Sequence, residues 1–457
     1  MRSEPRVIVV ANRLPVTRGR GEDRAWDVSP GGLVTALMPT VRERRGAWVG
    51  WPGSAERGIR PFSHEGVSIR PVTLGDAEIR DYYHGFSNRT LWPLYHDAIR
   101  TPEFQRHWWR AYLEVNRRFA RAAANTARGR DIVWVQDFHL QLVPGMLREL
   151  RPDLRIGFFL HIPFPPEELF AWLPWREEIL RGLCGADVVG FQTAGDAQNF
   201  SRLARRFLDL DGTDTELHVG RRKVRVGAFP ISIDFSEFDQ IAARPETLAR
   251  AKEIRKRLGG RKVILCVDRL DYTKGIDLRL ATVEQMLDRG ELDPARTVLV
   301  QVAVPSRETV QEYADLRTTV EQAVGRINGE YSQVGRVAVH YFRRNLSREE
   351  LVAHYRAADV MMVTPLRDGM NLVAKEFCAS RPDLGGVLVL SEFAGASRQL
   401  RRALLVNPRD IDGTATTLRE ALAMRRGDGR QRMAILRMMV RRHDVHVWAH
   451  EFLEALA

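Results

Sequence analysis

The chain has 457 residues, and its 70 Lys and Arg against 58 Asp and Glu give a formal net charge of +12. A hydrophobic share of 44% with a charged share of 28% is typical of globular proteins and excludes a disordered or fibrous chain. No run reaches the about 18 apolar residues of a membrane span, and the five at 7–11 are too few for a signal peptide. We therefore expect a cytoplasmic protein that has no membrane partner.

Short apolar runs alternate with amphipathic stretches along the chain. Continuous Val, Ile and Leu runs are typical of parallel strands buried on both faces, and the helical stretches between them complete βαβ units. The predicted strands are 6–11, 132–136, 156–161, 188–191, 224–229, 263–267, 297–304, 337–342, 360–364, 386–390 and 403–406. The main predicted helices are 167–173, 197–208, 247–258, 307–324, 348–356 and 430–456.

The alternation pauses at the stretch FPISIDFSEF (229–238) and restarts after a long polar helix. A chain of this length exceeds what one hydrophobic core usually supports. We therefore place a domain boundary at about 233 and expect two Rossmann-like halves with a cleft between them. In such sheets, ligands bind beyond the carboxyl ends of the strands.

Two polar clusters at predicted strand ends complement each other chemically. DRLDYTKG (268–275) offers the cations Arg269 and Lys274. TPLRDGMNLVAKE (364–376) leads from a strand through a turn into a helix, whose N-terminus and N–H groups favour anions. Glu376, about one turn inside that helix, is placed to accept from sugar or ribose hydroxyls. Together these groups suit a diphosphate with attached sugars.

Four further clusters are ANRLP, SPGGLVTAL, WVQDFHLQ and FFLHIPFP, which contain Arg13, the pair Gly31 and Gly32, Asp137, and His161. Each has an ordinary alternative: a solvated turn, a helix entry loop without a ligand, or a structural histidine. Of the six clusters, five follow predicted strands. Five unrelated solvated turns would not all be expected at strand ends, so this arrangement favours a binding site.

Other features have simpler interpretations. Basic pairs such as Arg401 and Arg402 are scattered over predicted helices, which favours solvated faces over a nucleic-acid partner. Cys184, Cys266 and Cys378 show no metal-binding spacing and fit buried thiols in a reducing compartment. The phosphatase-like DLDGT (209–213) follows a predicted helix instead of a buried strand, so we interpret it as a surface turn.

The motifs ANRLP, GGL, WVGW, YYHGFSNRTLWPLYH, WVQDFHL, GFFLHIPFP, DRLDYTKG, GRINGEY, TPLRDGMNLVAKEF and VLVLSEFAGA occur in this order over nearly the whole chain. In these motifs the chain resembles the trehalose-6-phosphate synthases of glycosyltransferase family 20. The resemblance implies an α/β GT-B fold with an acceptor-binding domain at 1–232 and a nucleotide-sugar-binding domain at 233–435. It also implies that a final helix at 436–457 packs back on the first domain.

The activity that the resemblance implies is a retaining, metal-independent transfer of glucose from UDP-glucose or GDP-glucose to glucose 6-phosphate. The product would be α,α-trehalose 6-phosphate, and no cofactor would be needed beyond the nucleotide sugar. Arg269 and Lys274 would stabilise the departing diphosphate, and the family view is front-face attack with the acceptor proton passing to the leaving phosphate. A homo-oligomer, dimer or tetramer, is left open, as are ADP-glucose as donor and allosteric regulation.

The resemblance also implies residue roles. Asp137 and His161 would lie near the reacting sugars together with the two cations. The remaining donor-binding residues would be Gly31, Gly32, Phe342, Asp368, Gly369, Met370, Asn371, Leu372 and Glu376. The acceptor-binding residues would be Arg13, Trp51, Tyr83, Trp92, Asp137 and Arg307. No residue is assigned to a metal.

Departures from the family pattern are small: Asp268 stands where many members have Glu, and Phe138 where many have Tyr. The Gly- and Arg-rich loop 14–29 is expected to order over bound phosphates. Two alternatives remain: a related glycosyl- or pseudoglycosyltransferase with another phosphorylated acceptor, and a non-catalytic regulator that binds sugar phosphate. Loss of Arg269, Lys274 or Glu376 would mark the regulator, and all three are present.

Overall fold

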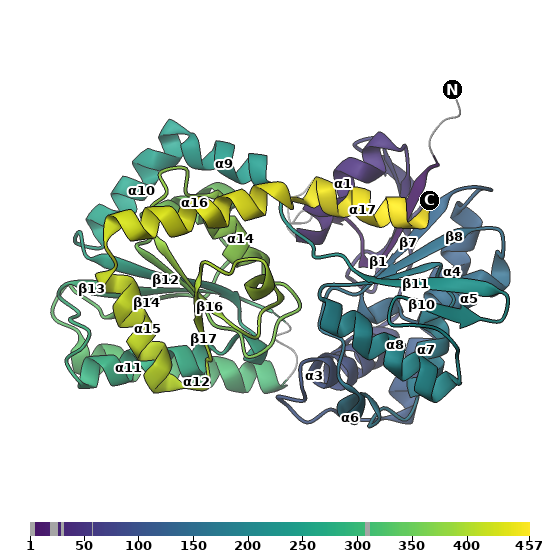
Figure 1. Ribbon diagram of the computed structural model, residues 1–457, viewed down its shortest axis with the longest axis horizontal. Coiled ribbons are helices and arrows are strands. Elements are labelled where there is room, and N and C mark those ends of the chain that lie inside the picture. The colour runs from purple at the N-terminus through teal and green to yellow at the C-terminus, as the bar shows by residue number, and fades with distance from the viewer. Residues whose placement is uncertain (1–4, 19–25, 29–31, 57, 307–310) are drawn as a thin grey trace. The chain divides into compact units, whose positions relative to one another are not determined.

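The computed structural model describes residues 5–18, 26–28, 32–56, 58–306 and 311–457. The chain divides into two compact units: the first comprises residues 1–231 and 446–457, and the second comprises residues 232–445. Among the helices of the described residues, none combines the length and the apolar character needed to cross a bilayer. Figure 1 shows that each unit is a sheet with helices on both faces.

The first unit is built on a nine-stranded sheet of order β10-β11-β9-β8-β7-β1-β4-β6-β5. Its strands are β1 (Val7–Arg13), β4 (Ala47–Trp51), β5 (Phe62–His64), β6 (Val67–Pro71), β7 (Ile132–Gln136), β8 (Arg155–Phe159), β9 (Val188–Phe191), β10 (Glu216–Val219) and β11 (Arg222–Ala228). The pairs β10–β11 and β5–β6 are antiparallel and the other pairs are parallel. β4, β7 and β9 are buried throughout, and β1 is buried except for Arg13, as expected of the strands of a parallel sheet that is covered on both faces.

The helices of the first unit include the π-helix η1 (Ile79–Leu91) and the 3-10 turn η2 (Phe138–Leu140). The α-helices are α1 (Gly32–Glu43), α2 (Asp76–Glu78), α3 (Trp92–Tyr95), α4 (Arg106–Thr126), α5 (Val143–Leu150), α6 (Glu167–Phe170), α7 (Arg176–Leu183), α8 (Ala194–Leu208) and α17 (Val445–Leu456). α8 runs directly into exposed Asp209, so the phosphatase-like stretch follows a helix, as predicted from the sequence.

The last helix, α17, supplies core side chains to the first unit. The Phe452 ring stacks on Trp134 of β7 at a centroid distance of 4.5 Å, and the Trp448 indole N–H donates to the Phe229 carbonyl at 3.1 Å. Gly157 of β8 lies beneath this helix, where an added Cβ would come within 2.6 Å of Leu456. The helix predicted over 430–456 is in fact two helices, because α16 (Arg426–Arg442) ends at Arg442 and α17 begins at Val445. The segment that belongs to the first unit begins at residue 446 instead of 436.

The second unit contains a six-stranded parallel sheet of order β14-β13-β12-β15-β16-β17. The strands are β12 (Lys262–Arg269), β13 (Thr297–Val304), β14 (Val339–Phe342), β15 (Val360–Val363), β16 (Val387–Ser391) and β17 (Leu404–Val406). The helices are α9 (Phe235–Ala243), α10 (Pro245–Arg257), η3 (Tyr272–Lys274), α11 (Ile276–Asp288), α12 (Gln311–Tyr331), α13 (Arg348–Ala357), α14 (Leu372–Ala379), η4 (Gly395–Arg398), α15 (Ile411–Ala423) and α16. In Figure 1, α10 and α16 cover one face of this sheet and α11 and α12 the other.

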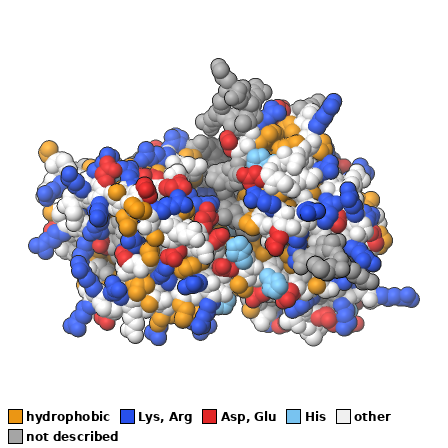
Figure 2. Space-filling view, turned by 90° about the horizontal axis from the view of Figure 1, so that it is seen from above, with side chains coloured by type: hydrophobic (Ala, Val, Ile, Leu, Met, Phe, Trp, Pro, Cys, Tyr) orange, Lys and Arg blue, Asp and Glu red, His pale blue; other side chains and the backbone are white. Residues whose placement is uncertain are grey.

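The predicted loop 14–29 contains two short antiparallel strands, β2 (Val16–Arg18) and β3 (Trp26–Val28), and its other residues 19–25 and 29 lie outside the described residues. Figure 2 shows Lys and Arg side chains spread over the visible face and interspersed with Asp and Glu. On that face the positive charge does not gather into one patch of the kind that nucleic-acid binding uses.

Candidate functional site

The strand order of each sheet places a topological switch point where the candidate residues lie. In the first unit the chain adds β4 and β6 on one side of β1, and β7, β8 and β9 on the other. In the second unit it adds β13 and β14 on one side of β12, and β15, β16 and β17 on the other. Ligands of open α/β sheets bind beyond the carboxyl ends of the strands at such points, here β1 with β7 and β12 with β15.

At the end of β1, Arg13 is held by aromatic rings. Its guanidinium carbon lies 4.4 Å from the Trp51 ring centroid and 5.8 Å from that of Tyr83, within the range of cation–π attraction. Gly53, with φ of +97°, leaves the space for this arrangement, because a Cβ there would lie 1.7 Å from Nη1 of Arg13. Three predicted acceptor-binding residues, Arg13, Trp51 and Tyr83, are therefore in direct contact.

The π-helix η1 joins this cluster to β1. Its buried Tyr82 donates from its hydroxyl to Oδ1 of Asn12 at 2.9 Å, and its neighbour Tyr83 stacks on His139 at 5.8 Å between ring centroids. Trp92, the first residue after η1, is buried and packs on Phe138 at 5.6 Å, and Phe138 in turn packs on His139. Trp92 is thus connected to the other predicted acceptor residues through two intervening rings.

Asp137, directly after β7, has an unusual backbone conformation with φ of 72° and ψ of 169°. Its N–H donates to the Phe159 carbonyl at 2.8 Å, and its carboxylate Oδ1 accepts the N–H of His161 at 3.1 Å. These bonds fix the carboxylate between the ends of β7 and β8. A non-glycine residue at positive φ costs energy, and such residues gather at functional sites.

His161 lies beside Asp137, two residues beyond the end of β8. Its Nε2 donates to Oε1 of Gln136 at 2.8 Å, which leaves Nδ1 as an acceptor. Burial lowers the pKa of the His161 imidazole from 6.5 to about 3, so the ring is neutral at physiological pH. A neutral imidazole can accept a sugar hydroxyl but cannot contribute a positive charge.

The low pKa of His161 predicts a dependence of stability on pH. Below about pH 6.5 the unfolded chain takes up a proton at this residue, whereas the folded chain does so only near pH 3. The free energy of unfolding is therefore unaffected by this residue above about pH 6.5 and decreases as the pH falls from there toward pH 3. Compared with His161→Asn, the wild type should lose about 1–2 kcal/mol of unfolding free energy between pH 7 and pH 5. Urea unfolding of both proteins at the two pH values measures this, and parallel pH profiles would contradict the assigned pKa.

In the second unit, Arg269 is the exposed last residue of β12, and Lys274 lies in η3 with only 7% of its surface exposed. Gly275 follows at φ of +61°, and a Cβ there would lie 2.7 Å from the Thr364 carbonyl oxygen. The close approach of η3 to the end of β15 therefore requires glycine. It brings Nζ of Lys274 within 2.6 Å of Oδ2 of Asp368.

The turn from Asp368 to Leu372 is fixed on both sides. Its Asp368 N–H donates to Phe393 at 3.2 Å, and its Met370 carbonyl accepts the N–H of Ala396 at 2.8 Å. Asn371 has φ of 76°, donates from its side chain to Asp368 at 3.1 Å and caps α14 by accepting the N–H of Ala374 at 3.1 Å. The structure thus joins Lys274, Asp368 and Asn371 directly, and it engages the Asp368 N–H that was expected to be offered to a ligand.

Glu376 and Phe342 lie in the same unit. Glu376 accepts the hydroxyl of Tyr355 at 2.8 Å, and burial raises the pKa of its carboxyl. Phe342 is the last residue of β14, with the guanidinium carbon of Arg344 at 5.2 Å from its ring centroid. The binding roles expected for both residues stay predictions.

Arg279 is an important residue that sequence reasoning missed. Its guanidinium is buried and donates to Asp268 at 2.6 Å, to Gln301 at 2.8 Å and to the Thr364 hydroxyl at 3.0 Å, with a further bond to the Lys274 carbonyl at 3.3 Å. It therefore connects β12, β13, the end of β15 and η3. The sequence did contain a signal for its burial, because Arg279 lies on the apolar face of α11, between Ile276 and Val283.

Three sequence predictions cannot be placed fully. Gly31 and Arg307 lie outside the described residues, and Gly32 is described as the first residue of α1. Among the described residues, no group of three or more His, Cys, Asp or Glu side chains is arranged to hold a metal ion.

Comparisons with known proteins agree on one family. The model of glycosyltransferase family 20 matches residues 5–457. Trehalose-6-phosphate synthases of Mycolicibacterium gilvum and Mycobacterium avium are each 55% identical, over 98% of this chain and 93% and 95% of theirs. A Burkholderia vietnamiensis structure, an α,α-trehalose-phosphate synthase (UDP-forming), has a TM-score of 0.91 at 38% identity and covers 100% of this chain and 99% of its own.

Structures with ligands are among the matches. A UDP-forming synthase of Burkholderia xenovorans in complex with glucose-6-phosphate is 34% identical, with a TM-score of 0.90 over 99% of this chain and 100% of its own. The E. coli protein bound with UDP-2-fluoro glucose also has a TM-score of 0.90 at 34% identity, over 99% and 98%. The family model and these structural matches define a glycosyltransferase of the GT-B fold. The chain belongs to glycosyltransferase family 20, the family of the trehalose-6-phosphate synthases.

Proposed function

We propose that the protein transfers glucose, with retention of configuration, from UDP-glucose to glucose 6-phosphate and forms α,α-trehalose 6-phosphate. The observation that carries this proposal is the 55% identity over nearly the full length to trehalose-6-phosphate synthases. The choice of UDP over GDP rests on the UDP-forming relatives and on the E. coli complex with UDP-2-fluoro glucose.

The donor residues are proposed to act on the leaving group. As the bond between the glucosyl carbon and the diphosphate oxygen breaks, negative charge grows on that oxygen, and Arg269 and Lys274 stabilise it. The proton of the acceptor hydroxyl passes to the leaving phosphate oxygen, so no protein base is required. Glu376 is proposed to accept the ribose hydroxyls, supported by its place about one turn inside α14.

The acceptor residues are proposed to recognise the 6-phosphate and the sugar. Arg13, fixed by the Trp51 and Tyr83 rings, offers a guanidinium for the phosphate. Asp137, held rigidly by two hydrogen bonds, is placed to accept sugar hydroxyls, and neutral His161 adds a further acceptor. Arg307 remains a proposed partner of the same phosphate.

The substrates proposed here are small molecules. The three cysteines are buried free thiols, which supports a reducing compartment such as the cytoplasm.

The experiment that tests the function is incubation of the full chain with glucose 6-phosphate and, separately, UDP-, GDP- and ADP-glucose in the presence of a metal chelator. UDP-glucose should give the fastest release of nucleoside diphosphate, and NMR of the product should show an α,α linkage. A disaccharide phosphate from none of the three donors would contradict the proposal, as would a β-linked product. Calorimetric binding of glucose 6-phosphate without turnover would instead favour the non-catalytic regulator.

A further inference from the structure

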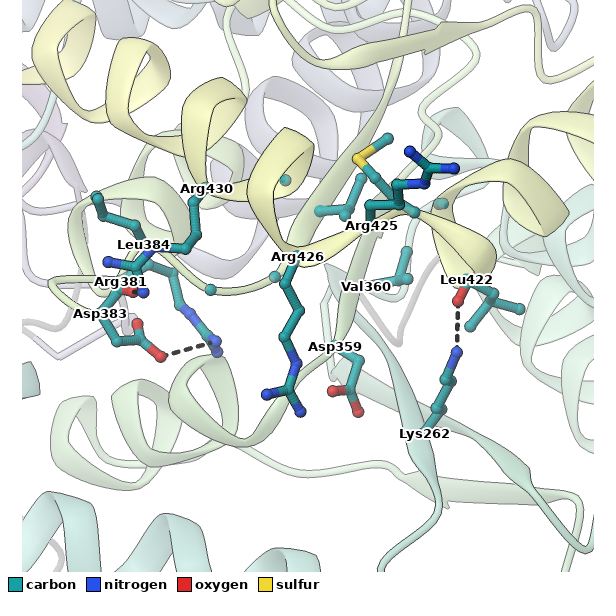
Figure 3. Close-up of a pocket in the computed structure, with 16 residues that line it drawn as sticks. Lys262, Asp359, Val360, Arg381, Asp383, Leu384, Leu422, Arg425, Arg426 and Arg430 are labelled. Atoms are coloured by element: carbon teal, nitrogen blue, oxygen red, sulfur yellow. Dashed lines mark hydrogen bonds and ion pairs between the residues drawn. The ribbon is translucent and has the colours of Figure 1, made fainter.

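A cavity of about 450 Å³ lies in the second unit at the amino ends of β12, β15 and β16, and the start of α16 forms part of its wall (Figure 3). Pockets of about 300–1,000 Å³ are typical of small-molecule sites. This cavity is separate from the proposed donor residues, because Lys262 lines it at the first position of β12 whereas Arg269 is the last residue of that strand. Seven strand steps separate the two residues by roughly 23 Å.

The lining of the cavity is strongly basic. Five cations line it, namely Lys262, Arg381, Arg425, Arg426 and Arg430, against the two carboxylates of Asp359 and Asp383. Both carboxylates already have partners: Asp359 pairs with Arg255 at 2.9 Å, and Asp383 pairs with Arg356 and with Arg381 at 3.1 Å. Asp383 therefore compensates Arg381, whereas the other four lining cations have no ion pair to a side chain within the described part of the chain.

Two of the lining arginines have no partner for their guanidinium groups among the described residues. Within the described part of the chain, neither Arg425 nor Arg426 has a hydrogen bond or an ion pair to another side chain or to a carbonyl. Figure 3 shows the Arg426 side chain extending from the start of α16, in this view between Asp383 and Asp359. Lys262 and Arg430 donate only to the carbonyls of Leu422 and Asp383 among the described residues, and a carbonyl leaves their charge uncompensated.

Arg381 gives the cavity a rigid cationic wall. It is 5% exposed, and its Nη1 donates to the carbonyls of Tyr355, Arg356 and Ala358 at 2.7–2.9 Å. Its Nε has no hydrogen-bond partner in the described structure. Burial lowers the pKa of Arg381 to about 10, so the group stays charged at neutral pH. Its Nη2 pairs with Oδ2 of Asp383 at 3.1 Å, so the carbonyls and this carboxylate hold the guanidinium in place at the wall.

We propose that this cavity binds a small phosphorylated molecule that carries two or more negative charges, at a site distinct from the residues proposed for the donor diphosphate. Arginine forks match phosphate oxygens bidentately, and the first turn of α16 adds the positive end of a 17-residue helix. A nucleic-acid strand does not fit, because the cavity holds a molecule of metabolite size. This proposal does not depend on the proposed function, since it concerns binding at the amino ends of the strands, whereas the proposed donor residues lie at the carboxyl ends.

The test uses inorganic pyrophosphate as the probe and isothermal titration calorimetry of the full chain at about 50 mM salt, where charge interactions are weakly screened. Wild type and Lys274→Ala should both bind pyrophosphate at the cavity, whereas Arg425→Gln with Arg426→Gln should weaken that binding at least tenfold. The matched control is Arg401→Gln with Arg402→Gln, which removes two exposed charges from the same unit but outside the cavity lining. Its affinity should stay within twofold of wild type.

A steric pair of variants separates the cavity from general surface charge. Gly429 lines the cavity, and a Cβ there would meet Met424 at 3.8 Å and Val387 at 3.9 Å, so Gly429→Met fills the space without changing charge. Gly427, two residues earlier in α16, faces open space, so Gly427→Met is its control. Introduced into the Lys274→Ala protein, Gly429→Met should abolish pyrophosphate binding. Gly427→Met in the same protein should leave that binding intact.

The proposal is overturned if Lys274→Ala removes all pyrophosphate binding, because the donor residues would then account for it. It is also overturned if the Arg401 and Arg402 control weakens binding as much as the cavity variant does. Thermal unfolding of every variant confirms that it is folded at the titration temperature. A failure of pyrophosphate binding at the cavity would not affect product formation from UDP-glucose, so the two proposals are tested by different measurements.

Discussion

Lys274→Ala is expected to lower kcat by about 10²–10³-fold, the range seen when one group that stabilises developing negative charge is removed. The expectation rests on the position of Lys274, which is almost fully buried and directed at Asp368 in the turn proposed to hold the donor. KM for glucose 6-phosphate should change little, because all the proposed acceptor-binding residues except Arg307 belong to the first unit. Initial rates at saturating UDP-glucose measure the effect.

Lys252→Ala is the matched control for Lys274→Ala, because Lys252 is an exposed lysine of α10 in the same unit. It should leave kcat within about twofold. A Lys274→Ala enzyme with near-normal kcat and a raised KM for glucose 6-phosphate would show that the donor and acceptor assignments are exchanged. Titration with UDP gives a second reading, since Lys274→Ala should also weaken binding of the product nucleotide.

Arg279→Leu is expected to cause the largest loss of stability, about 3–5 kcal/mol, because it leaves the Asp268 carboxylate buried without its partner. The side chains of Arg279 and Asp268 are 0% and 2% exposed in their ion pair. Urea unfolding of the full chain measures the loss, and hydrogen exchange at residues 262–269 localises it to β12.

The control for Arg279→Leu is Arg289→Leu at the end of the same helix, α11. Arg289 pairs with Asp412 at 2.8 Å, but the two side chains are 51% and 72% exposed, so the expected cost is at most about 1 kcal/mol. Replacing Asp268 and Arg279 together by Leu should recover part of the loss, because no buried charge then remains unpaired. Equal unfolding midpoints for the two single variants would contradict the role given to Arg279.

The sequence was sufficient to predict the strands that are continuous apolar runs. Each of the eleven predicted strands corresponds to a strand of the structure, and β7, β9 and β13 were placed with their observed bounds. β4 (Ala47–Trp51) was missed as a strand because its Gly and two Trp residues do not form a Val, Ile and Leu run. Its place depends on pairing with β1, which is not a local property of the sequence.

The site was predictable only as separate clusters. Lys274 and Asp368 are 94 residues apart in sequence, and their contact depends on the parallel pairing of β12 with β15. The π-helix around Tyr83 has no signature in 3.6-residue periodicity, so the ring contacts of Trp51, Tyr83 and His139 could not be derived from the pattern. The roles of these residues in binding still rest on the resemblance.

The position of α17 after the second unit in the sequence has a consequence for synthesis on the ribosome. Most of the first unit is translated before the second, yet the side chains that cover Trp134 and Gly157 come from residues 446–457, which are translated after the second unit. Domains that emerge early usually fold early, but this one stays incomplete, with an uncovered apolar surface, until α17 has been made. Termination of translation within the second unit therefore leaves a nascent product that is prone to aggregate and dependent on chaperones.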